Sequence, residues 1–265
     1  MTRSLPEYYT SLEPFRDLLL SGHGLLTYHH VGPRPAGARI KGLYVSPKLF
    51  QEQLAELQQA GFSAPDYNRV LEQAPAETDL PHTSGEGSNG RHARGRQVFL
   101  TFDDGFVDTF ENALPVLRQT GFRAIQFLVA GLLGKISEWQ VPCGDVAGQL
   151  MDCGQIKDWL AAGNEIGSHT SSHPRLTRLA PAQAREEIEA SKKMLEDTFG
   201  RPIQHFCYPY GDFNECVMDL VKKAGYESAC TTEFGVNNRV LNPFALKRIM
   251  ARYKSWSLRA LFSHN

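Results

Sequence analysis

Short apolar segments alternate with amphipathic ones along most of this chain, and this alternation constrains the fold more than any other feature. The apolar runs of strand length are 24–31, 97–102, 123–129, 165–168, 203–208, 226–231 and 244–250. Segments with helical spacing of apolar residues lie between most of them, among them 107–120 and the longest, 181–199, and we predict a short terminal helix around 256–262. Strands that alternate with helices form right-handed β-α-β units and a parallel sheet. About seven such units favour an α/β barrel over an open sheet.

The length of the chain and one unusual segment define the predicted domain organisation. A chain of 265 residues is of ordinary length for a single α/β barrel, so we predict one domain over residues 1–265. Residues 74–96 are rich in Gly, Ser, Pro and charged residues and contain almost no apolar ones. Such a composition cannot bury a core of its own, so we predict a flexible loop there.

Charge and cysteine content limit the partners that we expect. The chain has 28 Lys and Arg residues and 29 Asp and Glu residues, which gives a net charge of -1. This balance lacks the excess of positive charge that is typical of proteins that bind nucleic acid or an anionic membrane. No stretch approaches the roughly 20 apolar residues of a membrane span. The five cysteines form no C-x-x-C pair, and the N-terminal residues contain no apolar core of signal-peptide length. We therefore expect a cytoplasmic protein with reduced thiols; the sequence does not indicate an oligomeric state.

Polar clusters lie at the C-terminal ends of several of the predicted strands. They are His29–His30, Asp103–Asp104, His169 to His173, and Tyr208 to Gly211. The C-terminal ends of parallel barrel strands converge on one face of the barrel, where the chemistry of such folds is placed. We therefore expect these clusters to form one site.

Two of these clusters together indicate a metal site. Two adjacent carboxylates, Asp103 and Asp104, point in different directions after a strand, although Asp-Gly is also common in solvated turns. The i, i+4 spacing of His169 and His173 lets both imidazoles reach one ion, although this spacing alone is also found in packed or surface histidines. Pro174 disfavours helix at His173, so we expect a loop. Two His and one Asp form the open ligand set of a catalytic metal.

The third cluster, Tyr208 to Gly211, predicts a rigid rim beside this metal site. Its backbone N–H groups could face a developing oxyanion, and the rings of Tyr208 and Tyr210 could stack on a sugar. An ordinary turn at the end of a strand remains the alternative.

The motifs LTFDDGF (100–106), GSHTSSHP (167–174) and FCYPYG (206–211), in this order, resemble the polysaccharide deacetylase family, which is also called NodB homology or carbohydrate esterase family 4. The resemblance covers about residues 98–250. LLTYHHV (25–31) and FALKRI (244–249) are similar to the subgroup that contains bacterial poly-N-acetylglucosamine deacetylases.

The resemblance implies a distorted parallel barrel of the NodB type and the removal of an N-acetyl group from an amino sugar or glycan. It also implies one divalent ion, usually Zn²⁺. The implied metal ligands are Asp104, His169 and His173. Asp103 would be the general base, Thr170 would brace the histidine loop, and the backbone N–H of Tyr210 would donate to the oxyanion.

The sequence departs from the family pattern at two places. Many members carry Arg where this chain has Tyr208, and many have a C-terminal Leu-x-His segment that supplies the general acid, which this chain lacks. The subgroup that this chain resembles has a histidine at the end of the first strand, so the resemblance implies His29 as the acid. Its neighbour His30 lies on the opposite face, and we expect a structural role for it. Arg248 could replace the missing Arg.

Two other functions remain open at this point. The same fold family includes enzymes that hydrolyse ureides, cyclic amides or acetyl esters with the same ligands. A glycan-binding module with a decayed site would also fit the two departures, although it would have no reason to keep both aspartates and both histidines.

Overall fold

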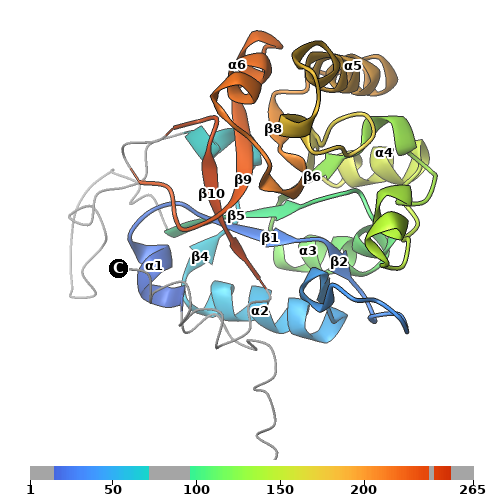
Figure 1. Cartoon of the computed structure of the whole chain (residues 1–265). Coiled ribbons are helices and arrows are strands. Elements are labelled where there is room, and N and C mark those ends of the chain that lie inside the picture. Colours follow the sequence, from blue (N-terminus) through green and yellow to red (C-terminus); the bar gives the residue numbers. More distant parts are fainter. Residues whose placement is uncertain (1–14, 72–95, 239–241, 252–265) are drawn as a thin grey trace, which may run out of the picture.

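A closed ring of parallel strands forms the centre of the protein (Figure 1). The computed structural model describes residues 15–71, 96–238 and 242–251. The ring contains β1 (Gly24–Tyr28), β5 (Arg96–Phe102), β6 (Ala124–Leu128), β7 (Glu165–Ser168), β8 (His205–Cys207), β9 (Ser228–Phe234) and β10 (Leu246–Met250). β1 pairs with β10 at one side and with β5 at the other, which closes the barrel. The predicted parallel barrel with about seven strands is confirmed.

Three short strands lie outside the ring. β4 (Phe62–Ser63) pairs with the first residues of β5, and β2 (His30–Val31) pairs with β3 (Tyr44–Val45) as a separate parallel pair.

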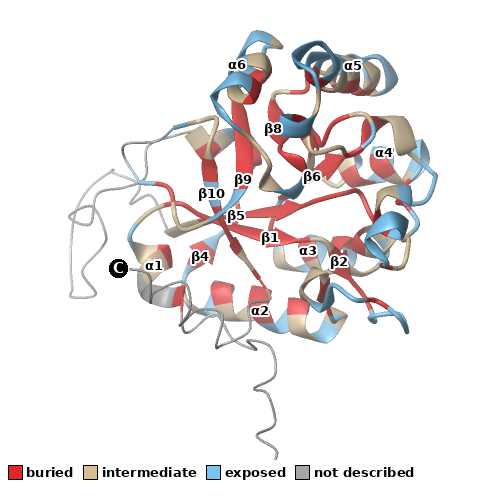
Figure 2. Ribbon diagram, viewed as in Figure 1, coloured by how far each residue is buried: buried red, intermediate tan, exposed pale blue. Residues whose placement is uncertain are grey.

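Helices surround the barrel and bury one face each against it (Figure 2). They are α1 (Arg16–Leu20), α2 (Pro47–Gln59), α3 (Leu114–Thr120), α4 (Cys153–Ala161), α5 (Pro181–Phe199) and α6 (Glu215–Lys223). Ser46 caps α2: its Oγ accepts from the backbone N–H of Leu49 at 3.2 Å, and Pro47 occupies the first helical position. Short 3₁₀ turns connect the elements at η2 (Lys41–Leu43), η3 (Tyr67–Leu71), η6 (Ala130–Leu132), η7 (Glu138–Cys143), η8 (Leu176–Arg178) and η9 (Pro209–Gly211).

The core is divided by the barrel wall. An inner cluster takes alternate residues from the strands, with η3 closing one end: Leu25, Tyr67, Val70, Phe99, Ile125, Phe127, Cys207, Cys230 and Leu246. The intervening residues face the helices in a larger cluster. Side chains alternate along a strand, so Phe99 and Thr101 of β5 face inward and Asp103, two residues further on, does the same. The strand period thus places one carboxylate inside the barrel mouth.

Several predicted elements differ from those observed. The predicted helix 107–120 is helical throughout but contains a π-helical turn (η5, Thr109–Ala113) ahead of α3, because Pro115 has no N–H to donate to the preceding turn. The predicted strand 24–31 is interrupted at His29, between β1 and β2. We predicted no element for residues 130–150, which contain η6 and η7.

Some predictions concern residues outside the described ranges. These are the loop at 74–96, apart from Arg96 in β5, a helix around 256–262, and the N-terminal segment on which the cytoplasmic location rests; these remain predictions. Within the ranges given above, no helix has both the length and the apolar character needed to cross a membrane.

Candidate active site

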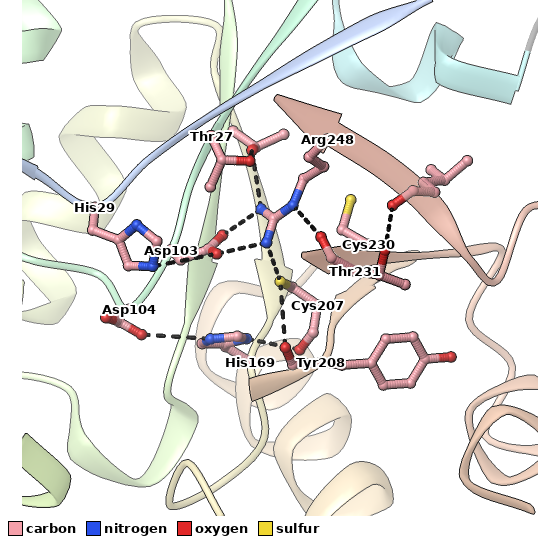
Figure 3. A network of polar contacts seen from close by, with 12 residues as sticks. Thr27, His29, Asp103, Asp104, His169, Cys207, Tyr208, Cys230, Thr231 and Arg248 are labelled. Atoms are coloured by element: carbon pink, nitrogen blue, oxygen red, sulfur yellow. Dashed lines mark hydrogen bonds and ion pairs between the residues drawn. The ribbon is translucent and has the colours of Figure 1, made fainter. Parts of the chain in front are cut away.

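Asp103 lies inside the barrel mouth and is paired with Arg248 of β10 (Figure 3). The guanidinium donates two parallel hydrogen bonds to the carboxylate, Nη1 to Oδ1 at 2.8 Å and Nη2 to Oδ2 at 2.7 Å. Arg248 is itself fixed, because its Nε donates to the backbone carbonyl of Thr231 at 2.7 Å. Burial alone would raise the pKa of Asp103, but the guanidinium and, to a smaller extent, His29 lower it below its usual value. Asp103 is therefore held as a carboxylate.

Asp104 points toward the two histidines of the second motif. Its Oδ1 lies 3.4 Å from Nε2 of His169 and 3.3 Å from Nε2 of His173, and all three side chains are buried. These distances exceed those of good charge-assisted hydrogen bonds. Asp104 Oδ1 has no hydrogen-bond partner although it is buried. A buried carboxylate oxygen facing two imidazole nitrogens without a hydrogen bond is the arrangement expected of metal ligands.

The histidine rings present the correct nitrogens for such a role. Nδ1 of His169 lies 2.7 Å from the backbone carbonyl of Cys207, and because a carbonyl only accepts, Nδ1 carries a proton, while Nε2 is the nitrogen that faces Asp104. His173 stacks on Trp139 with ring centroids 4.4 Å apart and meets the edge of Tyr210 at 4.6 Å. Burial lowers the pKa of His173, against the opposing effect of Asp104. A neutral imidazole is the form that binds metal.

The motifs hold strained backbone. Across the described ranges, the non-glycine residues with positive φ are Asp104 (74°), Thr170 (68°), His173 (66°) and Tyr210 (59°). Each such residue costs on the order of 1–3 kcal/mol and persists only where its surroundings enforce it. At Asp104 the left-handed conformation ends the inward–outward alternation of β5, so that adjacent carboxylates serve different partners. The predicted loop at His173 is confirmed, although the residue before Pro174 is left-handed and not extended.

Thr170 braces this loop as predicted: its Oγ1 accepts from the backbone N–H of His173 at 3.0 Å.

A second group of possible ligands, Asp103, His169 and Cys207, is also close together. It fits a metal less well. Both oxygens of Asp103 already accept from Arg248, and burial raises the pKa of the Cys207 thiol well above its usual value. The residues present therefore fit one ion at Asp104, His169 and His173.

The two histidines after β1 have different surroundings. His29 lies in the pocket above the barrel, with Nε2 3.8 Å from Oδ2 of Asp103. Burial lowers its pKa, while Asp103 and Asp104 oppose this shift. His30 is stacked between Tyr44 and Phe106 and its Nδ1 lies 2.8 Å from Oδ2 of Asp108, which is a packed, structural environment.

The third motif divides its two tyrosines between core and pocket. Tyr208 is fully buried, stacks on Phe213 and donates to the backbone carbonyl of Phe244 at 3.1 Å, so the expectation that its ring could stack on a sugar is wrong. Figure 3 shows this ring directed away from the carboxylates, whereas Arg248 points at Asp103. Tyr210 is 37% exposed and lines the pocket, with Arg175 over its ring at 4.2 Å. The guanidinium missing from the third motif is thus supplied by β10.

The site lies at the base of a pocket of about 190 Å³. Its walls include residues that the sequence did not single out: Ile40, Leu43, Trp139, Cys143, Asp145 and Met250. Asp145 joins two walls, because its carboxylate accepts from the backbone N–H groups of Arg39 at 3.0 Å and Ile40 at 3.1 Å. The segment 138–145 has neither strand nor helix periodicity, so no sequence signal indicated its place.

The fold and the site together define the class of this protein: a closed parallel barrel with two carboxylates and two histidines gathered at its mouth. A sequence model of the family "Polysaccharide deacetylase" matches residues 90–229, more than half of the chain. This chain belongs to the polysaccharide deacetylase family.

Individual relatives agree with this assignment. The chain is 32% identical over 152 residues to "Putative polysaccharide deacetylase YxkH" of Bacillus subtilis, covering 57% of this chain and 50% of that protein. It is 23% identical over 164 residues to "Poly-beta-1,6-N-acetyl-D-glucosamine N-deacetylase" of Staphylococcus aureus, covering 58% of this chain and 54% of that protein. The chain therefore spans about half the length of these relatives.

A solved structure shows the same fold over most of the chain. BC0361, a polysaccharide deacetylase from Bacillus cereus, superimposes with a TM-score of 0.68 at 25% identity and covers 88% of this chain and 66% of that one.

Proposed function

We propose that this protein is a metal-dependent hydrolase that removes the N-acetyl group from an amino sugar within a glycan. One observation carries the metal dependence: Oδ1 of Asp104, buried and without a hydrogen-bond partner, faces the Nε2 atoms of His169 and His173 at 3.4 and 3.3 Å. Family membership supports the deacetylase activity. We infer Zn²⁺ as the ion, because two imidazoles and one carboxylate with open positions are typical of catalytic zinc.

When bound there, the ion would polarise the acetamide carbonyl and lower the pKa of a water molecule toward about 7. Asp103 would accept the proton of the attacking water, for which its ionised state suits it. The backbone N–H of Tyr210 would donate to the oxyanion of the tetrahedral intermediate. These roles rest on the placement of the residues at one pocket.

His29 is our choice for the group that protonates the leaving amine, because an amide nitrogen leaves poorly until it is protonated. Its Nε2 lies 3.8 Å from Oδ2 of Asp103, so a proton taken from water by Asp103 is close to the histidine that would need it. The products would be acetate and a free amino sugar.

The substrate class follows from the pocket and the relatives together. The exposed ring of Tyr210 can contact a sugar face, and a relative at 23% identity is named for a β-1,6-linked N-acetylglucosamine polymer. We infer an N-acetylglucosamine-containing glycan as the substrate.

The test is a measurement of acetate release from N-acetylglucosamine oligomers of different linkage and from an acetylated xylan, with the hydrolysis of a ureide followed in parallel by the loss of the ureide itself. We expect release from the amino-sugar oligomers, and loss of turnover in Asp103→Asn with the metal content unchanged. Hydrolysis of the ureide alone, or acetate release from the xylan ester alone, would assign the protein to another activity of this fold. Binding of oligomers without any release would indicate a glycan-binding module.

A further inference from the structure

Helix α5 holds the loop between the two candidate metal-ligating histidines through one side chain. Oε2 of Glu187 accepts from the backbone N–H groups of Ser171 and Ser172, each at 2.9 Å, and Oε1 accepts from the hydroxyl of Ser172 at 2.6 Å. The hydroxyl of Ser171 in turn donates to the backbone carbonyl of Glu187 at 3.3 Å. One carboxylate thus satisfies two consecutive backbone donors midway between His169 and His173.

The same helix face also holds the chain before this loop. Ser191 is four residues beyond Glu187 and therefore on the same side of α5. Its Oγ lies 2.7 Å from Oγ of Ser168, the residue that precedes His169. Ile188 is fully buried and packs this face of the helix against the barrel. Glu187 is therefore fixed relative to the end of β7.

The opposite side of the loop rests on η6. The backbone N–H groups of Ala130 and Gly131 donate to the carbonyls of Thr170 and Ser171, each at 2.9 Å. A Cβ at position 131 would lie 2.7 Å from the carbonyl oxygen of Ser171, so only glycine permits this approach. The loop is thus clamped between η6 and Glu187 while two of its residues keep left-handed backbone, Thr170 at 68° and His173 at 66°.

We propose that Glu187 is a positioning residue that sets the separation of the two histidine ligands by anchoring the loop between them; this rests on the proposed function. Without its carboxylate, two backbone donors lose their acceptor and the strained loop can relax. The two imidazoles then lose their fixed separation, so the metal binds more weakly. Glu187 bonds to Ser171 and Ser172 and acts through them.

Four variants distinguish the hydrogen bonds that Glu187 makes to the loop from the effect of its negative charge. Glu187→Gln keeps the length of the side chain and an oxygen for the two N–H groups but loses the charge. Glu187→Asp keeps the charge but is one methylene too short to reach them. Glu187→Ala loses both, and Glu189→Ala removes an exposed carboxylate from the same helix as the matched control.

Two readouts apply to the full chain: the dissociation constant for Zn²⁺ in competition with a chromophoric chelator, and amide hydrogen exchange of residues 168–174 in the metal-free protein. We expect Glu187→Ala and Glu187→Asp to weaken Zn²⁺ binding about tenfold or more, as loss of groups that orient ligands commonly does. Both should also exchange faster at 168–174. Glu187→Gln should stay within about threefold of the wild type, and Glu189→Ala should match it.

Wild-type Zn²⁺ affinity and wild-type hydrogen exchange in Glu187→Ala would overturn the proposal. Weak Zn²⁺ binding in Glu187→Gln together with normal binding in Glu187→Asp would also overturn it, because the charge alone would then account for the effect. Neither readout needs a substrate. Absent acetate release with normal Zn²⁺ binding in the wild type would therefore contradict the proposed reaction and leave the anchor intact. If the wild type bound no Zn²⁺, the proposed metal site would be contradicted. Unchanged hydrogen exchange of residues 168–174 in Glu187→Ala would then still contradict the proposed anchoring of the loop by Glu187.

Discussion

The guanidinium of Arg248 and the carboxylate of Asp103 face each other inside the barrel, joined by two hydrogen bonds of 2.8 and 2.7 Å although they lie 145 positions apart in the sequence. Both side chains are buried, with exposed fractions of 2% for Arg248 and 3% for Asp103. A bidentate pair fixes the orientation of the carboxylate as well as its charge. Asp103 therefore has Arg248 as its partner, whereas the carboxylate of Asp104 faces the two histidines.

Replacement of Arg248 should destabilise the fold more than the loss of one hydrogen bond would. Arg248→Met leaves Asp103 as a buried charge without a partner, and we expect the free energy of unfolding to fall by about 3–5 kcal/mol. In the double variant with Asp103→Asn, part of this loss should be recovered, because the unpaired charge is gone. Urea denaturation of both single variants and the double variant measures this coupling. Additive losses would show that the pair is not coupled.

Loss of His29 should affect difficult leaving groups more than easy ones. In His29→Ala we expect the deacetylation of an N-acetyl sugar to fall roughly 100-fold or more, since a positioned acid typically contributes at least this much. The cleavage of an aryl acetate should fall far less, because its leaving group needs no proton. The ratio of kcat/KM for the two substrates is the measurement. Equal losses on both would remove the acid role from His29.

The sequence predicted the barrel and the composition of the site for a physical reason. The periods of strands and helices are local properties, and parallel strands bring the residues at their C-terminal ends together wherever these lie in the chain. Asp103, Asp104 and His169 were found because they come at the end of a strand, and His173 was found by its i, i+4 spacing from His169.

Contacts that depend on three-dimensional packing were not predictable in the same way. Arg248 was only one possible replacement for a missing arginine, because its reach across the barrel depends on the register of β10. Tyr208 was expected at the rim, but its side chain faces outward from the barrel into the core. Trp139 and Asp145 lie in a segment without strand or helix periodicity, and Glu187 is one of several carboxylates on a predicted helix; only the fold places these residues beside the site.

Asp145 should influence substrate binding more than chemistry. It joins the backbone of residues 39–40 to the opposite wall of the pocket, so we expect Asp145→Ala to loosen the pocket. A loss of about 1–2 kcal/mol would raise KM for an oligomer roughly 5- to 30-fold with kcat nearly unchanged. Steady-state kinetics beside Asp158→Ala, which removes an exposed carboxylate of α4, is the comparison. A fall in kcat at constant KM would contradict this role.

His205 should make the protein sensitive to acid. Its ring lies between Ser228 and Asn68 at 2.9 Å each, and burial lowers its pKa from 6.5 to about 4. The unfolded chain therefore binds a proton below pH 6.5 that the folded protein resists until about pH 4, so stability decreases as pH falls through this window. Between pH 7 and pH 4.5 the wild type should lose roughly 2–3 kcal/mol more than His205→Gln. Urea denaturation at both pH values measures the difference; equal losses would contradict the assignment.

The central claim is that Asp104, His169 and His173 hold an ion that the deacetylation requires. Its most direct test is acetate release from N-acetylglucosamine oligomers by chelator-stripped protein, before and after one equivalent of Zn²⁺ is returned. We expect the stripped wild type to be inactive and to recover on addition of Zn²⁺, and Asp104→Ala to stay inactive with at least tenfold weaker Zn²⁺ binding. Full activity of the metal-free protein, or normal Zn²⁺ affinity in Asp104→Ala, would contradict the claim.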